Sequence, residues 1–172
     1  MQRKSGFTLL ELMIVIAILA IGASIAIPNF IGWIPKYRLR SGTNAIHSVL
    51  QQARLLAIRY HTDIVVDFTA NGYTAYADDG AGSADADNNG IPDNARNWTR
   101  DGAERVHTSG NLPAGVVVNN ASFGGAPRIR FDRRGFPINT GGAIGGGNVV
   151  LNAAGGLAQT ITLDITGNAR IL

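Results

Sequence analysis

The stretch SGFTLLELMIVIAILAIGASIAIPNF, residues 5–30, decides the fold of this 172-residue chain. A short basic head leads into an apolar run from Phe7 to Ile27, in which Glu11 is the only charged residue. At about 1.5 Å per residue, a helix over this run spans roughly 30 Å, the thickness of the hydrocarbon core of a bilayer. A carboxylate inside such a helix costs several kcal/mol unless a cation meets it, so Glu11 is a candidate functional residue.

An ordinary secretory signal is the alternative interpretation of this segment. The small residues that such a signal needs for cleavage are present at Ala17, Ala20, Ala23 and Ala26. Glu11 argues against a signal, because a cleaved apolar region gains nothing from a buried charge. Basic residues both precede and follow the apolar run, so charge counting alone leaves the orientation in the membrane open.

The hexapeptide GFTLLE, residues 6–11, followed by the apolar run and Pro28, resembles the class III signal of type IV pilins and type II secretion pseudopilins. This resemblance implies cleavage after Gly6 by a membrane prepilin peptidase and N-methylation of the new amino terminus at Phe7. It also implies that Glu11 neutralises the terminal amine of a neighbouring subunit during assembly. The implied partners are other pilin or pseudopilin subunits, the peptidase and, before assembly, inner-membrane lipid. The implied orientation has a cytoplasmic N-terminus and a C-terminal domain outside the cytoplasm.

The composition narrows what the rest of the chain can be. Removal of residues 1–6 takes two of the 15 basic residues away, which leaves 13 against 12 acidic ones. The mature chain is therefore nearly neutral, and its calculated pI of 9.7 overstates any affinity for nucleic acid or acidic lipid. The absence of cysteine excludes disulfides and thiol chemistry. The sequence also lacks G-x-S-x-G and H-E-x-x-H motifs, so we expect a chain that is not an enzyme.

Helical periodicity followed by strand periodicity predicts an α+β fold, in which a long N-terminal helix packs on an antiparallel β-rich domain. Pro28 and Pro35 are expected to loosen the helix, and Ser41 is expected to cap a second, amphipathic stretch. The predicted segments are a cleaved leader (1–6), a transmembrane assembly helix (7–35), an amphipathic helix (36–61) and a β-rich domain (62–172) with an acidic loop (78–101).

Strands and turns are predicted beyond His61, where the helical period ends and short strand-like runs are separated by turn signals. The predicted strands cover residues 63–68, 73–77, 115–118, 128–131, 148–151, 159–164 and 169–172. The predicted turns lie at 70–72, 132–135, 154–156 and 166–168.

Three further phrases resemble the H-type (GspH/FimT) minor pseudopilins: ARLLAI (53–58), FDRRG (131–135) and ITGNARI (165–171). This second resemblance covers most of the domain and implies a minor pseudopilin of a type II secretion system or a minor pilin of a type IV pilus. A DNA-binding minor pilin of natural transformation and a major type IV pilin are the alternatives.

The acidic loop is the candidate metal site. Oxygen ligands stand at the spacing of a calcium loop at Asp85, Asp87, Asn89, Ile91 (through its carbonyl) and Asp93. Arg96 occupies the place of the bidentate glutamate, which excludes a complete EF-hand. A truncated calcium site completed by Asp78, Asp79 or water is one hypothesis, and a solvated turn without an ion is the other. Apart from this calcium ion, we expect the chain to require no cofactor.

An arginine cluster is the candidate nucleic-acid site. Its members are Arg128, Arg130, Arg133, Arg134 and Arg170. Arg128 and Arg130 share a face if residues 128–131 form a strand. Binding to the DNA backbone needs several such phosphate contacts and weakens steeply with salt. The alternative is that these arginines form salt bridges at an exposed strand and turn.

Overall fold

A computed structural model describes residues 7–81, 84–85, 92, 95–101 and 103–172, with only the backbone of residues 28 and 29. One helix, α1 (Leu9–Tyr60), makes up the N-terminal third of the molecule. The hydroxyl of Thr8 caps its first turn by accepting the N–H of Glu11 at 3.2 Å. His61 ends the helix in the left-handed conformation, with φ of 52°. The α+β fold class is confirmed, since every element that follows α1 in the described residues is a strand.

The predicted long helix with an apolar and an amphipathic half is confirmed, but its predicted loosening at Pro28 and Pro35 and its cap at Ser41 are wrong, because α1 runs through residues 28–41 without a break. Pro28 removes one backbone donor, yet the ladder of hydrogen bonds on either side carries the helix through. Leu39 is already buried in the domain, and the Thr43 hydroxyl donates to its carbonyl at 2.8 Å. The helix therefore already packs on the domain at Leu39, two residues before Ser41. Ser41 is an exposed residue inside the helix and does not cap it.

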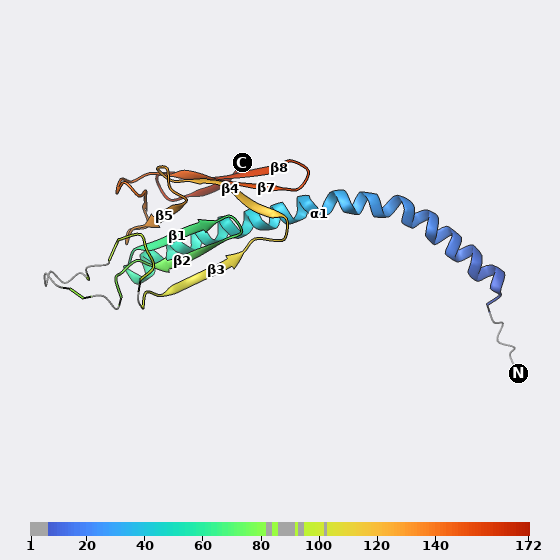
Figure 1. Ribbon diagram of the computed structural model, residues 1–172, viewed down its shortest axis with the longest axis horizontal. Helices are drawn as coiled ribbons and strands as arrows, with labels where there is room; N and C mark the ends of the chain where they lie inside the picture. The colour runs from blue at the N-terminus through green and yellow to red at the C-terminus, as the bar shows by residue number, and fades with distance from the viewer. Residues whose placement is uncertain (1–6, 82–83, 86–91, 93–94, 102) are drawn as a thin grey trace, which may run out of the picture.

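The first half of α1 projects away from the domain as a gently curved rod (Figure 1). Residues Leu9–Ile27 have a mean hydropathy of 2.6 and are not buried by any other part of the molecule. This segment is long and apolar enough to cross a membrane.

The second half of α1 forms the centre of the domain. Its buried face consists of Leu39, Thr43, Ile46, Val49, Leu50, Ala53 and Ala57. These positions recur every three or four residues, as the amphipathic pattern predicts. The face contacts strands of both sheets, so one helix joins two sheets into a single core.

The first sheet has the strand order β3-β2-β1-β5-β6, and all of its neighbours are antiparallel. Its strands are β1 (Ile64–Thr69), β2 (Gly72–Ala77), β3 (Val106–Asn111), β5 (Arg128–Phe131) and β6 (Pro137–Ile138). The second sheet, also antiparallel, has the order β4-β7-β8-β9. Its strands are β4 (Val116–Ser122), β7 (Gly147–Ala153), β8 (Leu157–Leu163) and β9 (Ala169–Ile171).

All seven predicted strands are present, with ends that shift by a few residues. Two further strands, β3 and β6, were not predicted. The β3 sequence, VHTSGN, contains serine, glycine and asparagine, which strands disfavour. It forms a strand because it pairs with β2 from Gly72 to Tyr76, a contact between segments far apart in the sequence.

Candidate functional site

The N-terminal turn of α1 presents the residues that the signal-like motif singles out. Gly6 lies outside the described residues, and Phe7 is 78% exposed. Glu11 lies in the first turn of α1, where the positive end of the helix dipole favours a carboxylate. Within the described part of the chain, no basic side chain forms an ion pair with Glu11. The Glu11 carboxylate can therefore pair with a cation that comes from another molecule.

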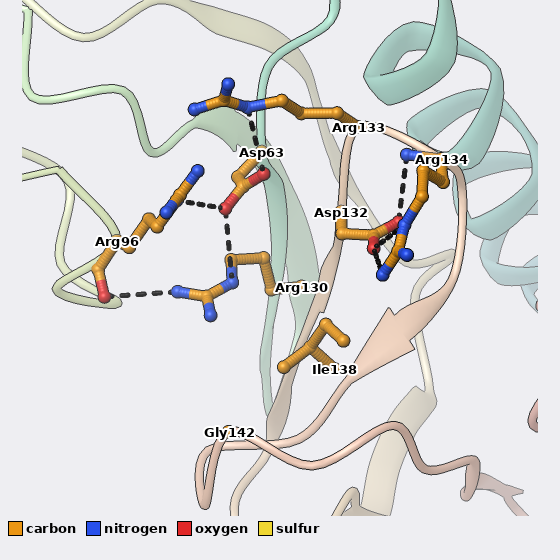
Figure 2. A pocket seen from close by; sticks show the side chains of 8 residues that line it. All are labelled: Asp63, Arg96, Arg130, Asp132, Arg133, Arg134, Ile138 and Gly142. Carbon is orange, nitrogen blue, oxygen red and sulfur yellow. Dashed lines mark hydrogen bonds and ion pairs between the residues drawn. The ribbon is translucent and has the colours of Figure 1, made fainter. Parts of the chain in front are cut away.

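A second site lies where the start of β1 meets the end of β2 and the middle of β5. Asp63, just before β1, is only 6% exposed. Its carboxylate lies 2.9 Å from Nε of Arg96, 3.7 Å from Nε of Arg130 and 4.0 Å from Nε of Arg133. Figure 2 shows the three guanidinium groups around this one carboxylate. A buried charge with several partners is stabilised only while those partners stay in place.

Asp78 is a second buried carboxylate, behind Arg130. Its oxygens accept the N–H groups of Asn97 at 3.1 Å and Trp98 at 3.2 Å, and Nη1 of Arg130 lies 3.7 Å away. Burial raises the pKa of Asp78, whereas the Trp98 hydrogen bond and Arg130 oppose that rise. Arg96 and Trp98 both have positive φ, at 63° and 69°. Asp78 therefore holds a segment whose backbone is strained by about 1 kcal/mol or more at each of these two residues.

Glu104, which no sequence motif singled out, is a third buried carboxylate, and it holds the loop between β2 and β3 at Gly80 and Asp101. It is 2% exposed, and its two oxygens accept the N–H groups of Gly80 and Asp101, both at 2.8 Å. Burial raises the pKa of Glu104 against these hydrogen bonds. No local pattern marks Glu104, because its partners are set by the path of the loop between β2 and β3.

The predicted arginine cluster is only partly available to a ligand. Arg128 donates to the carbonyl of Trp98 at 2.6 Å and lies 3.5 Å from Asp67, and Arg130 stacks on the Trp98 ring at 4.4 Å. Arg133 and Arg134 have side chains that are 52% and 72% exposed. Arg170 lies on β9 of the other sheet and does not line the pocket described below.

A pocket of about 380 Å³ opens beside this cluster (Figure 2). Its lining residues are Asp63, Arg96, Arg130, Asp132, Arg133, Arg134, Ile138 and Gly142. On one side, Arg134 donates through Nε and Nη2 to Oδ2 of Asp132, at 3.0 and 2.9 Å. On the other side lies Asp63 with its three arginines. The pocket is therefore polar and cationic.

Two turns, one in each sheet, have the same hydrogen-bond pattern: the first connects β5 to β6 and the second connects β8 to β9. In residues 132–136 and 164–168, the leading aspartate carbonyl accepts the glycine N–H, and its Oδ1 accepts the N–H groups two and four residues on. The glycines, Gly135 and Gly167, have φ of 82° and 83°. A Cβ on Gly167 would lie 2.7 Å from the carbonyl oxygen of Gly135, so the turns touch.

Both turns contact α1 at the same place. A Cβ on Gly135 would lie 2.7 Å from Cδ1 of Ile58, and Nη1 of Arg54 donates to Oδ1 of Asn168 at 2.9 Å. The three phrases singled out in the sequence, at 53–58, 131–135 and 165–171, therefore converge on one point. That point joins the helix to both sheets.

The family model described as "Type II transport protein GspH" matches residues 42–168. The chain belongs to this family. The GspH match covers the second half of α1 and nearly all of both sheets, including the point where the three phrases meet. A second model, the "Prokaryotic N-terminal methylation motif", matches residues 1–27, the leader and apolar half of α1. The resemblances drawn from the sequence are confirmed.

Two curated relatives match shorter stretches. The chain is 42% identical over 65 residues to the type II secretion system core protein G of Klebsiella pneumoniae, which is 36% of this chain and 46% of the relative. It is 62% identical over 39 residues to the type IV major pilin protein PilA of Myxococcus xanthus (strain DK1622), which is 23% of this chain and 16% of the relative. The chain thus spans less than half the length of either relative. No solved structure gives a significant match.

The candidate calcium site of this GspH-family chain falls mostly outside the described residues. Asp85 is described, whereas Asp87, Asn89, Ile91 and Asp93 are not. Of the two aspartates that would complete the site, Asp78 already binds two amides and faces Arg130, and Oδ1 of Asp79 accepts the N–H of Ala81. Calcium binding here stays a prediction.

The β5–β6 turn gives a prediction for the pH dependence of stability. Burial raises the pKa of Asp132, but hydrogen bonds from the Phe136 N–H and from Arg134 outweigh burial and hold that pKa below its ordinary value. A carboxyl with a lowered folded-state pKa adds stability above its unfolded pKa, and this stability is lost as the pH falls through the folded pKa.

Asp132→Asn keeps an acceptor oxygen in the turn and removes the charge. We expect the wild-type chain to melt at a higher temperature than this variant at pH 7, and we expect the gap to shrink progressively below about pH 4. Thermal melting curves of both chains, recorded between pH 7 and pH 2, measure the gap. A gap that does not change with pH would mean that the variant disturbs the geometry of the turn rather than its charge.

Proposed function

We propose that this chain is a non-enzymatic filament subunit, a minor pseudopilin of a type II secretion system, which assembles from the inner membrane. One observation carries the proposal. The apolar half of α1, with a single carboxylate in its first turn, is exposed along its whole length and continues without a break into the helix at the centre of the GspH domain. A soluble protein does not leave 19 such residues unburied, whereas a subunit that bundles its helices with neighbours requires them.

Assembly in this proposal begins with cleavage after Gly6 and methylation of the amine of Phe7. The chain then stands in the inner membrane with its N-terminus in the cytoplasm and its domain outside. On extraction, the apolar halves of many copies pack side by side. Ala17, Ala20 and Gly22 allow close approach of these helices, and a Cβ on Gly22 would meet nothing within 4 Å in the isolated subunit.

Glu11 sets the register of assembly in this proposal. The methylated amine of a neighbouring subunit is a cation that can meet the carboxylate inside the apolar bundle. A copy placed one position out of register would leave both charges desolvated and unpaired, which costs several kcal/mol. A misplaced subunit would therefore be rejected.

The choice of a secretion filament rests on the GspH match across the domain. A DNA-binding minor pilin is the second candidate, but two of its five proposed arginines, Arg128 and Arg130, are already bound within the domain. A major pilin is the third, and it would have to be abundant in filaments.

Deletion of the gene, followed by complementation with the wild-type chain, tests the proposal in the source organism. We expect exoproteins to accumulate inside the cell after deletion, and sheared filaments to contain the chain only as a minor component. Normal secretion together with lost twitching or DNA uptake would assign the chain to a type IV pilus instead. Abundance equal to that of the main filament protein would make it a major pilin.

A further inference from the structure

We infer that the pocket between the β5–β6 turn and residues 95–98 binds an oxyanion of the phosphate class. The cationic groups that line it are Arg96, Arg130, Arg133 and Arg134. The ligand is either free phosphate or a phosphate group of a nucleic-acid backbone. This inference goes beyond the filament role, which needs no small ligand.

Arg133 supplies unused hydrogen-bond donors. Its nearest charged neighbour is Oδ1 of Asp63, 4.0 Å from Nε, which is too long for a hydrogen bond. Within the described residues, none of the five N–H groups of the Arg133 side chain donates a hydrogen bond. The side chain is 52% exposed and lines the pocket. An acceptor in the pocket therefore has a free guanidinium fork to bind.

Arg130 supplies a buried donor without a hydrogen-bond acceptor. The residue is only 9% exposed, and its Nε has no hydrogen-bond partner in the part of the chain that the structure describes. Oδ2 of Asp63, its ion-pair partner, lies 3.7 Å away, too far for a hydrogen bond, and is already 2.9 Å from Nε of Arg96. Buried donors in folded proteins are nearly always paired, so a ligand oxygen or an ordered water is expected at this point.

The charges of the pocket do not cancel. Four arginines and two aspartates line it, which leaves a formal charge of +2. The carboxylate of Asp78, behind Arg130, reduces this excess to +1. Asp132 pairs with Arg134 and Asp63 lies 2.9 Å from Arg96, so the excess lies mainly with Arg133, whose Nε is 4.0 Å from Asp63. Arg96 reaches the pocket from a backbone with φ of 63°, a conformation that costs energy and that clusters at functional sites.

A pocket with free N–H donors and a net positive charge matches an anion that has several oxygens to accept hydrogen bonds and no donor of its own. Guanidinium groups bind phosphate through two parallel hydrogen bonds, a geometry that a lysine cannot reproduce. A metal ion is excluded by the excess of positive charge. Phosphate is therefore the class of ligand that matches the donors, because its oxygens can accept the two parallel N–H groups of a guanidinium fork.

Calorimetric titration of the mature full-length chain, in a neutral detergent at low ionic strength, tests the inference. Inorganic phosphate is expected to bind at one saturable site. Arg133→Gln is expected to weaken binding about tenfold or more, and Arg133→Lys is expected to weaken it nearly as much, because the fork is lost. Arg170→Gln removes the same charge outside the pocket, and we expect it to change the affinity by less than about twofold.

Melting temperatures of the variants show whether they fold, since Arg133 is half exposed and contributes no hydrogen bond to the described part of the domain. Absence of saturable binding to the wild-type chain at millimolar phosphate would overturn the inference. Equal weakening by Arg133→Gln and Arg170→Gln would also overturn it, because that result means diffuse charge rather than a site. If a short single-stranded oligonucleotide displaces phosphate and responds to the same variants, the phosphate belongs to nucleic acid. If it does not, the ligand is the free ion.

Discussion

Replacement of Glu11 by alanine is expected to lower the amount of this subunit in sheared filaments by about tenfold or more, while its amount in the membrane stays unchanged. The carboxylate is exposed on an apolar helix and has no cationic partner among the described residues. Without it, the amine of a neighbouring subunit would be buried unpaired at several kcal/mol. Quantitative immunoblots of sheared filaments and of membranes measure the ratio.

Two control variants separate the charge from the helix. Thr8→Ala removes the cap that accepts the Glu11 N–H, which costs about 1 kcal/mol of local helix stability but keeps the carboxylate. We expect Thr8→Ala to assemble nearly normally and Glu11→Asp to assemble in part. If Glu11→Ala entered filaments at the wild-type level, the proposed role of Glu11 in register would be wrong.

Replacement of Gly167 by alanine is expected to destabilise the domain by about 2–4 kcal/mol. Part of this loss comes from the left-handed backbone, with φ of 83°. The larger part comes from the new Cβ, which would lie 2.7 Å from the Gly135 carbonyl oxygen and 3.1 Å from Nε of Arg54. The two turns would have to separate, and both sheets would lose their contact with α1 at that point. Thermal melting of the mature chain, followed by the β-sheet circular dichroism signal, measures the loss.

Gly155→Ala is the matched control for this substitution. Gly155 has φ of 82°, nearly that of Gly167, but a Cβ there would meet nothing within 4 Å. We expect it to cost only the backbone term, about 1 kcal/mol, which corresponds to a fall in melting temperature of roughly 2–4 °C. Equal losses for Gly155→Ala and Gly167→Ala would show that the contact between the turns does not stabilise the domain.

Much of the fold could be predicted because its signals are local. An apolar run with one charge indicates a membrane helix, and a short run rich in β-branched and aromatic residues, such as IVVDF in β1, indicates a strand. The strand β5 matches its prediction at both ends, so Arg128 and Arg130 do share a face. The loosening at Pro28 and Pro35 and the cap at Ser41 were predicted wrongly, because buried contacts of Leu39 and Thr43 outweigh the local preferences of proline and serine.

The candidate pocket depends on contacts that no local pattern contains. In the sequence, five arginines form one group, and the aspartates of residues 78–93 form a separate acidic loop without basic residues. The structure instead places Asp63 and Asp78 among Arg96, Arg130 and Arg133, across strands that lie far apart in the chain. These ion pairs form because the strand order of the first sheet places β1, β2 and β5 side by side. The two strands that were not predicted, β3 and β6, belong to the same sheet.

The unbroken course of α1 has a mechanical consequence. Its 52 residues form a rod about 78 Å long, one end of which is apolar while the other lies between the two sheets. Figure 1 shows the buried half running alongside β1 and β2, so a pull on the apolar end acts along the direction of these strands. Such a force shears all the contacts between helix and sheets together instead of peeling them apart one after another. The paired turns at Gly135 and Gly167, which grip α1 near its far end, extend this shared resistance over the length of the domain.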